Sequence, residues 1–387
     1  MKNRSLFIVL ASVVLGFRVG AAPWILSANE GKLDLFTGIT RVVPNPAPDS
    51  LTLLDFAVSP PRVTHFTNIS NSVLGPPSNV AFTPDGFLAL IADSVHIDPA
   101  NPTKWLPHQG IHVLDLTSVP PHFLADVSAG LQPSGISVAP NGTFALVANR
   151  AGGSVTRLKI QGHTVTSAET VNFTQGTNEV SDVGISPDGR FALASVREAN
   201  HLRLFRCDGG SLQITDRKIS AYGRPYRVIF TPDGQFALTA GQGAGNLNGN
   251  DLDAMTVIRR RGDDFQTVDF IPLGSAPETI EVSPDGKLIA ALVMNGSNLS
   301  PSTNGYHDHG QLVILTRRGD TFVRTQTIDV GRIPEGVAFS PDGREVIVQC
   351  HPARELRLYP IRRERVLENY DRIIVPGFPS GLRASSH

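Results

Sequence analysis

The sequence predicts an all-β fold: a seven-bladed β-propeller in which each blade is a sheet of four antiparallel strands. Three observations lead to this prediction. A phrase recurs six times along the chain, a second pattern recurs downstream of it, and the two chain ends complete one another. The repeating unit is 45–57 residues long, a length that suits a four-stranded blade. No run of ten residues within a unit shows a helical period.

The recurring phrase consists of two apolar runs around a Pro-Asp-Gly turn, as in PSNVAFTPDGFLALIAD at residues 77–93. Proline presets φ in such a turn, the aspartate or asparagine bonds the local backbone, and glycine takes the positive φ. The flanking residues alternate as half-buried strands require. We therefore expect the first run to form strand A of a blade and the second to form strand B. The turn residue falls at positions 85, 141, 188, 233, 285 and 342.

The second pattern lies downstream of the phrase and supplies two further strands. Residues 53–66 match residues 113–126, with a Leu-Asp pair and a Pro-Pro pair in the same register. Residues 256–270 match residues 313–328 around an Arg-Gly-Asp triplet, which we interpret as a hairpin turn. Each unit therefore contains strands A, B, C and D.

The chain ends supply the seventh blade. The segment WILSAN at residues 24–29 has the character of a strand B, but no strand A precedes it. At the other end, residues 379–382 (PSGL) copy the strand A at residues 133–136 (PSGI), but no turn follows. We therefore expect the C-terminal segment to provide strand A to the blade that begins the mature chain, which pairs two otherwise exposed edges.

Composition and charge exclude several classes of protein. Hydrophobic residues make up 41% and charged residues 18% of the 387 residues, which argues against a disordered chain and a polytopic membrane protein. The formal net charge is −1, so no overall field favours nucleic acid as a partner.

The first residues resemble an export signal. Lys2 and Arg4 precede an apolar run at residues 6–17, and small residues at 19–21 suit a cleavage site. The run is too short to span a bilayer. We expect a signal peptide at residues 1–21 and a single propeller domain at residues 22–387, which is periplasmic or secreted, monomeric and without a membrane span.

The repeated phrase Pro-x-x-(Val/Ile)-x-(Phe/Val)-(Ser/Thr)-Pro-Asp-Gly resembles the YVTN-type repeat and the repeats of seven-bladed, lactonase-like propellers. The resemblance covers nearly all of the mature chain. It rests on turn and strand residues, so it implies the architecture more than the activity. That superfamily includes lactone hydrolases, a cycloisomerase, dehydrogenase subunits and proteins without known catalysis.

A functional site is expected on the propeller face that carries the D–A and B–C connections, which we call the mouth. Strands A line the central channel of a propeller, and long connections on one face are often binding elements. Four B–C connections are long: 29–50, 93–110, 241–253 and 295–310. They belong to blades 7, 1, 4 and 5, so two walls are expected to face each other across the channel.

Residues at the starts of strands A and the ends of strands B should converge on this mouth. Guanidinium groups can hold a carboxylate or phosphate, and two nearby carboxylates give one raised pKa that suits proton transfer. The candidate catalytic residues are Glu278, Glu335, His351 and Arg227. The candidate substrate-binding residues are Arg150, Arg197, Asn149, Asn295 and Asp93.

These residues leave two interpretations of function open. The first is an exported lactonase-like enzyme, a hydrolase or a cycloisomerase, that acts on a small anionic substrate. The second is a non-catalytic propeller that binds a ligand or a protein partner, with the charged residues forming salt bridges across the channel.

No cofactor is predicted, although a divalent metal is possible. His307 and His309 lie one residue apart in an extended segment and, together with Glu278 or His351, could hold such an ion. A hydrogen-bonded or exposed pair of loop histidines is the other interpretation.

Overall fold

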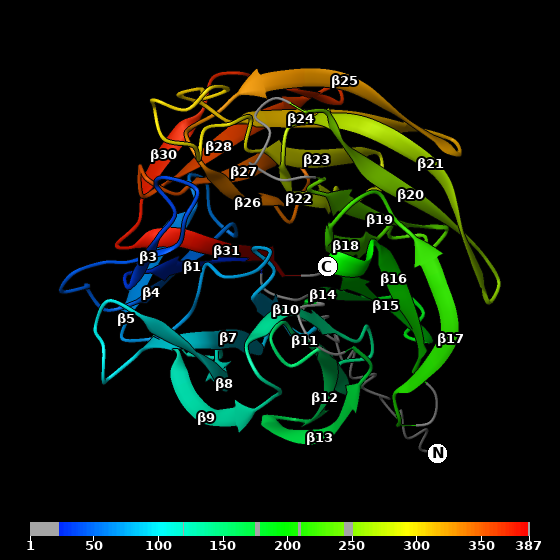
Figure 1. Cartoon of the computed structure of the whole chain (residues 1–387), viewed down its shortest axis with the longest axis horizontal. Coiled ribbons are helices and arrows are strands. Elements are labelled where there is room, and N and C mark those ends of the chain that lie inside the picture. Colours follow the sequence, from blue (N-terminus) through cyan, green and yellow to red (C-terminus); the bar gives the residue numbers. More distant parts are fainter. Residues whose placement is uncertain (1–22, 119, 175–178, 208–209, 244–250, 386–387) are drawn as a thin grey trace, which may run out of the picture.

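Strand pairing arranges the chain as seven sheets around a central axis (Figure 1). The computed structural model describes residues 23–118, 120–174, 179–207, 210–243 and 251–385. Each sheet is a blade with four antiparallel strands, to which one blade adds a fifth, two-residue strand, so the predicted all-β, seven-bladed propeller is confirmed. A short hairpin of β2 (Leu33–Asp34) and β3 (Arg41–Val42) lies outside the blades.

The first three blades follow the chain in order, with the innermost strand first. Blade 1 contains β6 (Val80–Phe82), β7 (Leu88–Ile97), β8 (Trp105–Asp115) and β9 (His122–Ser128). Blade 2 contains β10 (Pro133–Val138), β11 (Phe144–Asn149), β12 (Ser154–Gln161) and β13 (Thr164–Asn172). Blade 3 contains β14 (Val180–Ile185), β15 (Phe191–Val196), β16 (His201–Arg206) and β17 (Gln213–Ser220), with a 3₁₀ turn at Arg197–Ala199.

The remaining blades complete the ring. Blade 4 contains β18 (Pro225–Phe230), β19 (Phe236–Gly241), β20 (Asp253–Arg261) and β21 (Asp264–Gly274). Blade 5 contains β22 (Pro277–Val282), β23 (Leu288–Val293), β24 (Gln311–Arg318) and β25 (Thr321–Asp329). Blade 6 contains β26 (Pro334–Phe339), β27 (Glu345–Cys350), β28 (Glu355–Arg362) and β30 (Asp371–Ile374), with β29 (Arg365–Val366) also paired to β28. Blade 7 contains β31 (Phe378–Ala384), β1 (Trp24–Glu30), β4 (Ser50–Asp55) and β5 (Arg62–Thr67).

The ring closes within blade 7, as the sequence predicts. Strand β31 pairs antiparallel with β1, and Leu382 faces Ser27 across the ladder. Figure 1 shows the red C-terminal strand beside the blue N-terminal one, between blades 6 and 1. The backbone groups of both strands are thereby paired, so the propeller has no open edge at this point.

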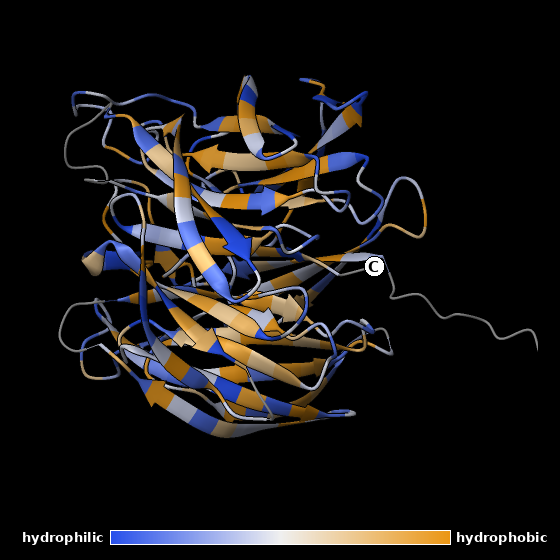
Figure 2. Cartoon of the chain, turned by 90° about the vertical axis from the view of Figure 1, so that its right-hand side faces the viewer, coloured by the Kyte–Doolittle hydropathy of each residue, from blue (hydrophilic) through white to orange (hydrophobic). Residues whose placement is uncertain are grey.

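The hydrophobic core lies between the blades. Each interface is formed by alternate residues of facing strands, such as Leu238 and Val257 of blade 4 against Ile289 and Val313 of blade 5. Figure 2 shows the resulting bands of hydrophobic and hydrophilic residues along the strands. This alternation follows from the two-residue period of a β-strand.

The Pro-Asp-Gly turns form a ring on the face opposite the mouth, which we call the far face. In the turn of blade 1, the Thr83 hydroxyl donates to Asp85 and Gly86 has a φ of +74°. A Cβ placed on the turn glycine would lie 3.5–3.8 Å from the proline of the preceding blade, in the pairs Gly142–Pro84, Gly189–Pro140, Gly234–Pro187, Gly286–Pro232 and Gly343–Pro284. Successive turns are therefore in close contact around the ring.

The expected signal peptide lies outside the described residues. Within the described part of the chain, no helix is both long enough and apolar enough to cross a membrane.

Candidate functional site

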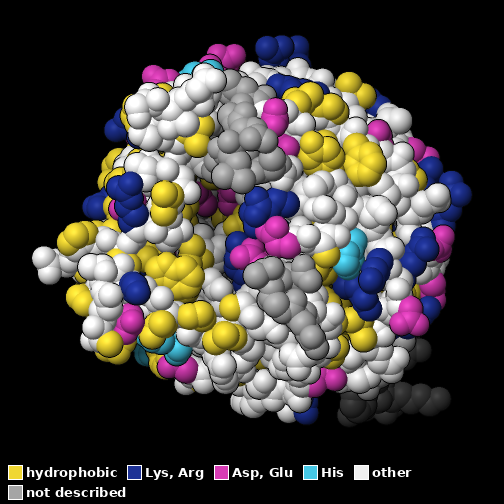
Figure 3. All heavy atoms as spheres, in the orientation of Figure 1, with side chains coloured by type: hydrophobic (Ala, Val, Ile, Leu, Met, Phe, Trp, Pro, Cys, Tyr) yellow, Lys and Arg dark blue, Asp and Glu magenta, His cyan; other side chains and the backbone are white. Residues whose placement is uncertain are grey.

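The mouth faces the viewer in Figure 3, which shows a hollow near its centre. Acidic side chains lie inside the hollow, and basic and acidic side chains lie on its rim. The side chains described below come from the starts of strands A and from the ends of strands B in several blades.

Glu278, the second residue of β22, is a buried carboxylate at this mouth. Its Oε2 atom accepts a hydrogen bond of 3.0 Å from the Gln242 side chain, which follows β19 of the neighbouring blade. Burial raises the pKa of Glu278 to about 7, although the nearby guanidinium groups of Arg197 and Arg150 oppose this shift. Glu278 therefore exchanges a proton near neutral pH.

Arg150 and Arg197 form the positive side of the mouth. Both guanidinium groups lie over the ring of Tyr226, at 5.6 and 5.7 Å from its centroid. Both also pair with the Glu179 carboxylate, at 2.6 Å for Arg150 and 3.4 Å for Arg197. Arg197 donates two hydrogen bonds to Gln242 Oε1, so Gln242 bridges this arginine and Glu278. The predicted convergence of Arg150, Arg197 and Glu278 is present.

Tyr226 forms the surface on which the two arginines rest. It is buried at the start of β18. Burial and the negative charge of Glu278 raise the pKa of Tyr226 above its ordinary value. The phenol therefore stays protonated and serves as an aromatic support for the guanidinium groups.

Glu335 and Glu30 extend the acidic side of the mouth. Glu335 is only 1% exposed, and its Oε1 atom has no hydrogen-bond partner among the described residues. Burial raises the pKa of Glu335 well above its ordinary value, and the charges of Glu278 and Glu30 raise it further. Burial also raises the pKa of Glu30, to about 8, although Lys32 lies 3.3 Å away. Three carboxylates thus share one buried region, in which it is costly to ionise all of them.

His351 occupies an aromatic site beside the mouth. Its ring stacks on Phe378 at 5.1 Å and meets the edge of Phe36 at 6.2 Å. Nδ1 bonds the carbonyl oxygen of Pro379 at 2.9 Å, whereas the buried Nε2 has no described partner. Burial lowers the pKa of His351 to about 4, so the ring is neutral at pH 7. In the described part of the chain, these contacts of His351 include neither Glu278 nor Glu335.

Arg227 does not join the mouth group with which the sequence analysis placed it. Its guanidinium pairs with Asp182 at 3.1 Å and with Glu281 at 3.3 Å. Glu281 lies three residues after Glu278 in β22, toward the far face, where it lines a separate cavity. The register correctly placed Arg227 on a channel strand, but its long side chain reaches away from the mouth.

The other predicted binding residues have partners of their own. Asn149 is fully buried and bonds Ser154, Thr156 and the backbone of Gly130, so it joins neighbouring segments of blade 2. Asn295 adopts a φ of +50° and donates to the carbonyl oxygen of His309.

Asp93 accepts a bond from Ser70 and lies 3.1 Å from His108. None of these contacts of Asn149, Asn295 and Asp93 involves Glu278, Arg150 or Arg197.

The candidate metal ligands His307 and His309 are neighbours in the blade 5 connection. Their rings are 5.8 Å apart, and His309 lies 2.7 Å from Asp308 and 3.5 Å from Asp329. Neither Glu278 nor His351 is among these contacts. Over the described ranges, no three metal-ligating side chains are grouped as a metal site requires.

The long connections differ from the two expected walls. In the 29–50 connection, Phe36 and Leu35 pack on Ala276, Met294 and Ile333, so this segment crosses from blade 7 to blades 5 and 6. Much of the 93–110 connection is not a loop, because β7 and β8 continue their pairing as far as Ile97 and Trp105. Residues 244–250 of the fourth connection lie outside the described residues.

Comparisons with known proteins agree with this architecture. A family profile described as "Lactonase, 7-bladed beta-propeller" matches residues 164–261. Over 206 residues, or 49% of the chain, it is 26% identical to a 6-phosphogluconolactonase of Yersinia pestis (strain Pestoides F). A protein of the same name from Pectobacterium carotovorum is 27% identical over 206 residues. The chain spans 59–60% of the length of these curated relatives.

Solved structures extend the likeness over almost the whole chain. The periplasmic gluconolactonase PpgL of Pseudomonas aeruginosa is 20% identical with a TM-score of 0.68, and the match covers 94% of this chain and 99% of that one. The chain has the fold of a seven-bladed β-propeller and is similar to the lactonase family of that fold over residues 164–261. The hydrazine synthase of Kuenenia stuttgartiensis also matches, at 18% identity and a TM-score of 0.62 over 83% of this chain and 95% of that one. Such likenesses show the fold alone.

The sequence analysis missed three residues of the mouth: Gln242, Glu30 and Glu179. A signal for two of them was present. Gln242 and Glu30 each occupy the position at the end of a strand B that Arg150, Arg197 and His351 occupy in their own blades. Glu179 precedes β14 in a D–A connection, where the repeat has no fixed residue type.

Proposed function

We propose that this lactonase-like propeller hydrolyses the lactone of a small anionic sugar acid at its mouth. One observation carries the proposal. Glu278 is a buried carboxylate whose pKa is about 7, and it is linked through Gln242 to Arg197 in the same hollow that holds Arg150. A group that titrates near neutral pH suits general acid–base catalysis, and guanidinium groups suit an anionic substrate. The curated relatives named 6-phosphogluconolactonase support this choice of reaction.

In the proposed reaction, water attacks the carbonyl carbon of the lactone while the ionised Glu278 accepts its proton. The carbonyl oxygen becomes an oxyanion. The guanidinium group of Arg150 or Arg197 stabilises it by hydrogen bonding, while the other guanidinium group holds the anionic group of the substrate. The ring C–O bond then breaks, and the leaving alkoxide takes a proton from Glu278, or from the protonated Glu335, which then recovers a proton from Glu278. The products are the open-chain carboxylate and one proton, so atoms and charge balance without a cofactor.

Arg150 and Arg197 are proposed to bind the substrate anion. Each is held by Glu179 and by the Tyr226 ring, so its guanidinium group is already oriented before a ligand arrives. Preorganised donors lose less conformational entropy on binding. Arg227 and His351 have no role in the proposed reaction, because Arg227 pairs with Asp182 and Glu281 and His351 bonds the Pro379 carbonyl oxygen.

We further propose that the protein acts after export, because the expected signal at residues 1–21 precedes the propeller. A sugar-acid lactone that reaches the periplasm or the medium would then be the available substrate.

The experiment measures proton release from glucono-δ-lactone and its 6-phosphorylated form, with spontaneous hydrolysis subtracted. We expect Glu278→Gln to lower kcat by about 10²–10⁴-fold, because a carboxamide cannot accept the proton. We expect Arg197→Gln to raise KM for the phosphorylated lactone by about 10–100-fold and to affect the neutral lactone less. For the wild type, kcat/KM should rise with pH through about 7 as Glu278 ionises.

The matched control is Glu364→Gln, a carboxylate on the β28–β29 hairpin, which should retain full activity. Absence of turnover by the wild type would overturn the proposal. In that case, binding of 6-phosphogluconate that Arg197→Gln weakens would favour the second function, a ligand-binding propeller.

A further inference from the structure

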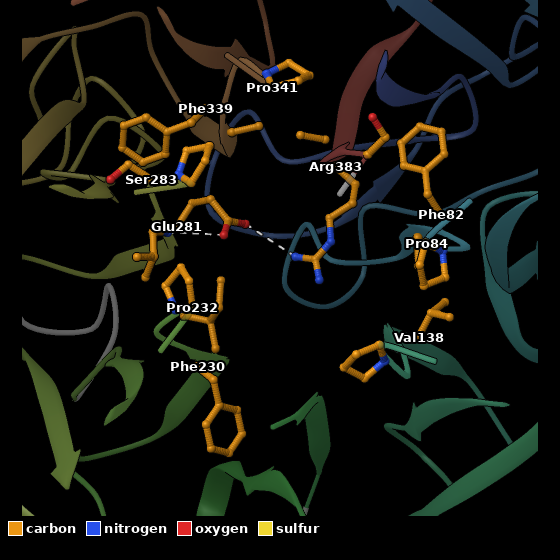
Figure 4. A pocket seen from close by; sticks show the side chains of 18 residues that line it. Phe82, Pro84, Val138, Phe230, Pro232, Glu281, Ser283, Phe339, Pro341 and Arg383 are labelled. Carbon is orange, nitrogen blue, oxygen red and sulfur yellow. Dashed lines mark hydrogen bonds and ion pairs between the residues drawn. The ribbon is translucent and has the colours of Figure 1, made fainter. Parts of the chain in front are cut away.

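A second cavity, on the far face of the propeller, has a chemistry unlike that of the mouth. Its volume is about 510 Å³, which is within the range of small-molecule sites. Figure 4 shows side chains from many blades converging on it, with Glu281 and Arg383 facing each other across the middle. Its wall is apolar and includes the turn prolines and the phenylalanines that precede them: Pro84, Pro140, Pro232, Pro284, Pro341, Phe82, Phe230 and Phe339.

The polar floor of this cavity is separated from the mouth by buried side chains. Arg227 and Asp182 are 3% and 0% exposed, and they pair with each other inside the channel. Arg227 also contacts Glu281, which in turn contacts Arg383 at 3.3 Å. A row of alternating charges therefore lies between this cavity and the mouth, and we expect it to separate a ligand in the far-face cavity from Glu278.

The charged groups at the floor of the cavity differ in how many of their hydrogen-bonding atoms already have partners. Glu281 Oε2 accepts from both Arg227 and Arg383, and Oε1 accepts from the Val282 amide. Both oxygens of Asp182 are also engaged, by Ser78, Arg227 and Val228. The carboxylates of Glu281, which lines the cavity, and of Asp182, which is buried beneath it, are thus already satisfied.

Arg383 is different, because it has donors to spare. In the described part of the chain, only its Nη1 atom has a hydrogen-bond partner, and the side chain is 23% exposed to the cavity and solvent. A guanidinium carries five N–H donors, of which most are left for a ligand. Desolvation and the neighbouring charge of Arg227 lower the pKa of Arg383, which an added anion would offset.

We propose that the far-face cavity binds a small carboxylic acid with an apolar body, such as a medium-chain fatty acid. The carboxylate accepts hydrogen bonds from Nε and Nη2 of Arg383, and the hydrocarbon chain lies against the proline and phenylalanine wall. Burial of the chain supplies affinity at about 25 cal/mol for each Å² removed from water, and the charged contact supplies selectivity for an acid. This binding is independent of the hydrolysis proposed at the mouth.

The test is isothermal titration calorimetry of the full protein with sodium octanoate, 1-octanol and sodium acetate. We expect octanoate to bind, octanol to bind at least about tenfold more weakly, and acetate not to bind measurably, because both the charge and the chain are needed. Arg383→Gln should weaken octanoate binding by about 10–100-fold and leave octanol unchanged, whereas Arg383→Lys should retain part of the difference.

Two further variants locate the site. Val138→Trp fills the cavity from the wall opposite Glu281, and it should abolish octanoate binding without loss of the fold (Figure 4). Arg344→Gln, also near a far-face turn and with a side chain 83% exposed, is the matched control and should bind octanoate as the wild type does. Arg197→Gln should likewise bind normally, which separates this site from the anion site of the mouth.

Any of three results would overturn the proposal. The first is no binding of octanoate by the wild type up to about 10 mM, where an affinity of about −3 kcal/mol would still be detected. The second is octanol binding as tightly as octanoate. The third is unchanged octanoate binding in both Arg383→Gln and Val138→Trp, provided that thermal unfolding shows both variants to be folded.

Discussion

Glu30, Glu278 and Glu335 lie together at the mouth, and each has a pKa raised by burial. They differ in how their charge is compensated. Glu30 has Lys32 beside it and Glu278 has Arg197 and Arg150, whereas the charges that act on Glu335 are those of the other two acids. Of the three acids, Glu335 is therefore the one whose ionisation lowers the free energy of unfolding most. It is also the one most suited to hold a proton at neutral pH.

This difference predicts the effect of Glu335→Gln on stability. Because the pKa of Glu335 is raised above 4.5 in the folded protein, the folded state holds a proton that the unfolded chain has lost, and stability falls as pH rises. Glutamine resembles the protonated acid but cannot ionise. We expect Glu335→Gln to match the wild type near pH 5 and to be more stable near pH 8, by about 1–3 kcal/mol. Thermal unfolding at the two pH values measures this.

Glu364 provides the control. Its exposed carboxylate forms ion pairs with Lys287 and Arg318, so Glu364→Gln should change stability little at either pH. A Glu335→Gln protein that is equally destabilised at both pH values would show that the carboxylate contributes contacts rather than an unfavourable charge.

Residue positions at the mouth could be predicted to the extent that the repeat fixes them. Arg150, Arg197, Glu278 and Glu335 occupy fixed places in their blades, and register alone placed them at the mouth. Arg227 comes one position after Tyr226, and a bulge in β18 lies between Pro225 and Val228. The direction of a side chain as long as arginine depends on charges in other blades, here Asp182 and Glu281, and a single sequence does not reveal those contacts.

At the scale of elements, the connection at 29–50 packs against His351 beside the mouth. Its Phe36 ring meets the edges of Phe378 at 5.3 Å and His351 at 6.2 Å, and its backbone carbonyl accepts a bond from Arg332. The connection is thereby attached to blades 6 and 7 and shields His351 from water. The low pKa of His351, about 4, reflects this shielding.

We therefore expect Phe36→Ala to raise the pKa of His351 from about 4 toward its ordinary value of 6.5, because water then reaches the imidazole. Loss of the two ring contacts should also lower stability by about 1–3 kcal/mol. The titration of the His351 ring protons, followed by NMR, measures the pKa. Ile39→Ala, at a position that is 67% exposed in the same connection, should leave it unchanged. An unaltered His351 pKa in Phe36→Ala would mean that other residues shield the ring.

The lengths of the connections were predictable, but their contacts were not. Long insertions between strands B and C are visible in the repeat, so the sequence analysis located them correctly. Whether an insertion forms a loop, extends a hairpin or crosses to another blade depends on where its apolar residues find partners. Val95 packs with Leu33 and Val73, which stabilises the extended β7–β8 hairpin. These partners come from the 29–50 connection and the segment before β6, which the repeat does not describe.

At the scale of the whole molecule, the seven-bladed ring was predictable almost completely. Each blade repeats the same turn and the same alternation, so local sequence specifies the unit, and the unit length together with the paired chain ends specifies the number. Closure then depends on one pairing between distant segments. Strand β31 contacts β1 within its blade and packs beside β26 and β6 of the adjacent blades. Loss of β31 would remove the contacts that β26 of blade 6 and β6 of blade 1 make with this strand.

Removal of residues 377–387 therefore tests how the ring is held together. Phe378 and Leu382 are buried, and burial of such side chains contributes about 1.5–3 kcal/mol each, before the lost backbone hydrogen bonds to β1 are counted. Because a domain is stable by only about 5–15 kcal/mol, we expect the truncated chain to aggregate or to unfold at a much lower temperature. A synthetic peptide of residues 377–385 added to the truncated chain should raise its Tm by restoring β31, and the same peptide with Leu382→Asp should not. An unchanged Tm after truncation would mean that the ring is held by the contacts between blades and that the β1–β31 pairing contributes little to its stability.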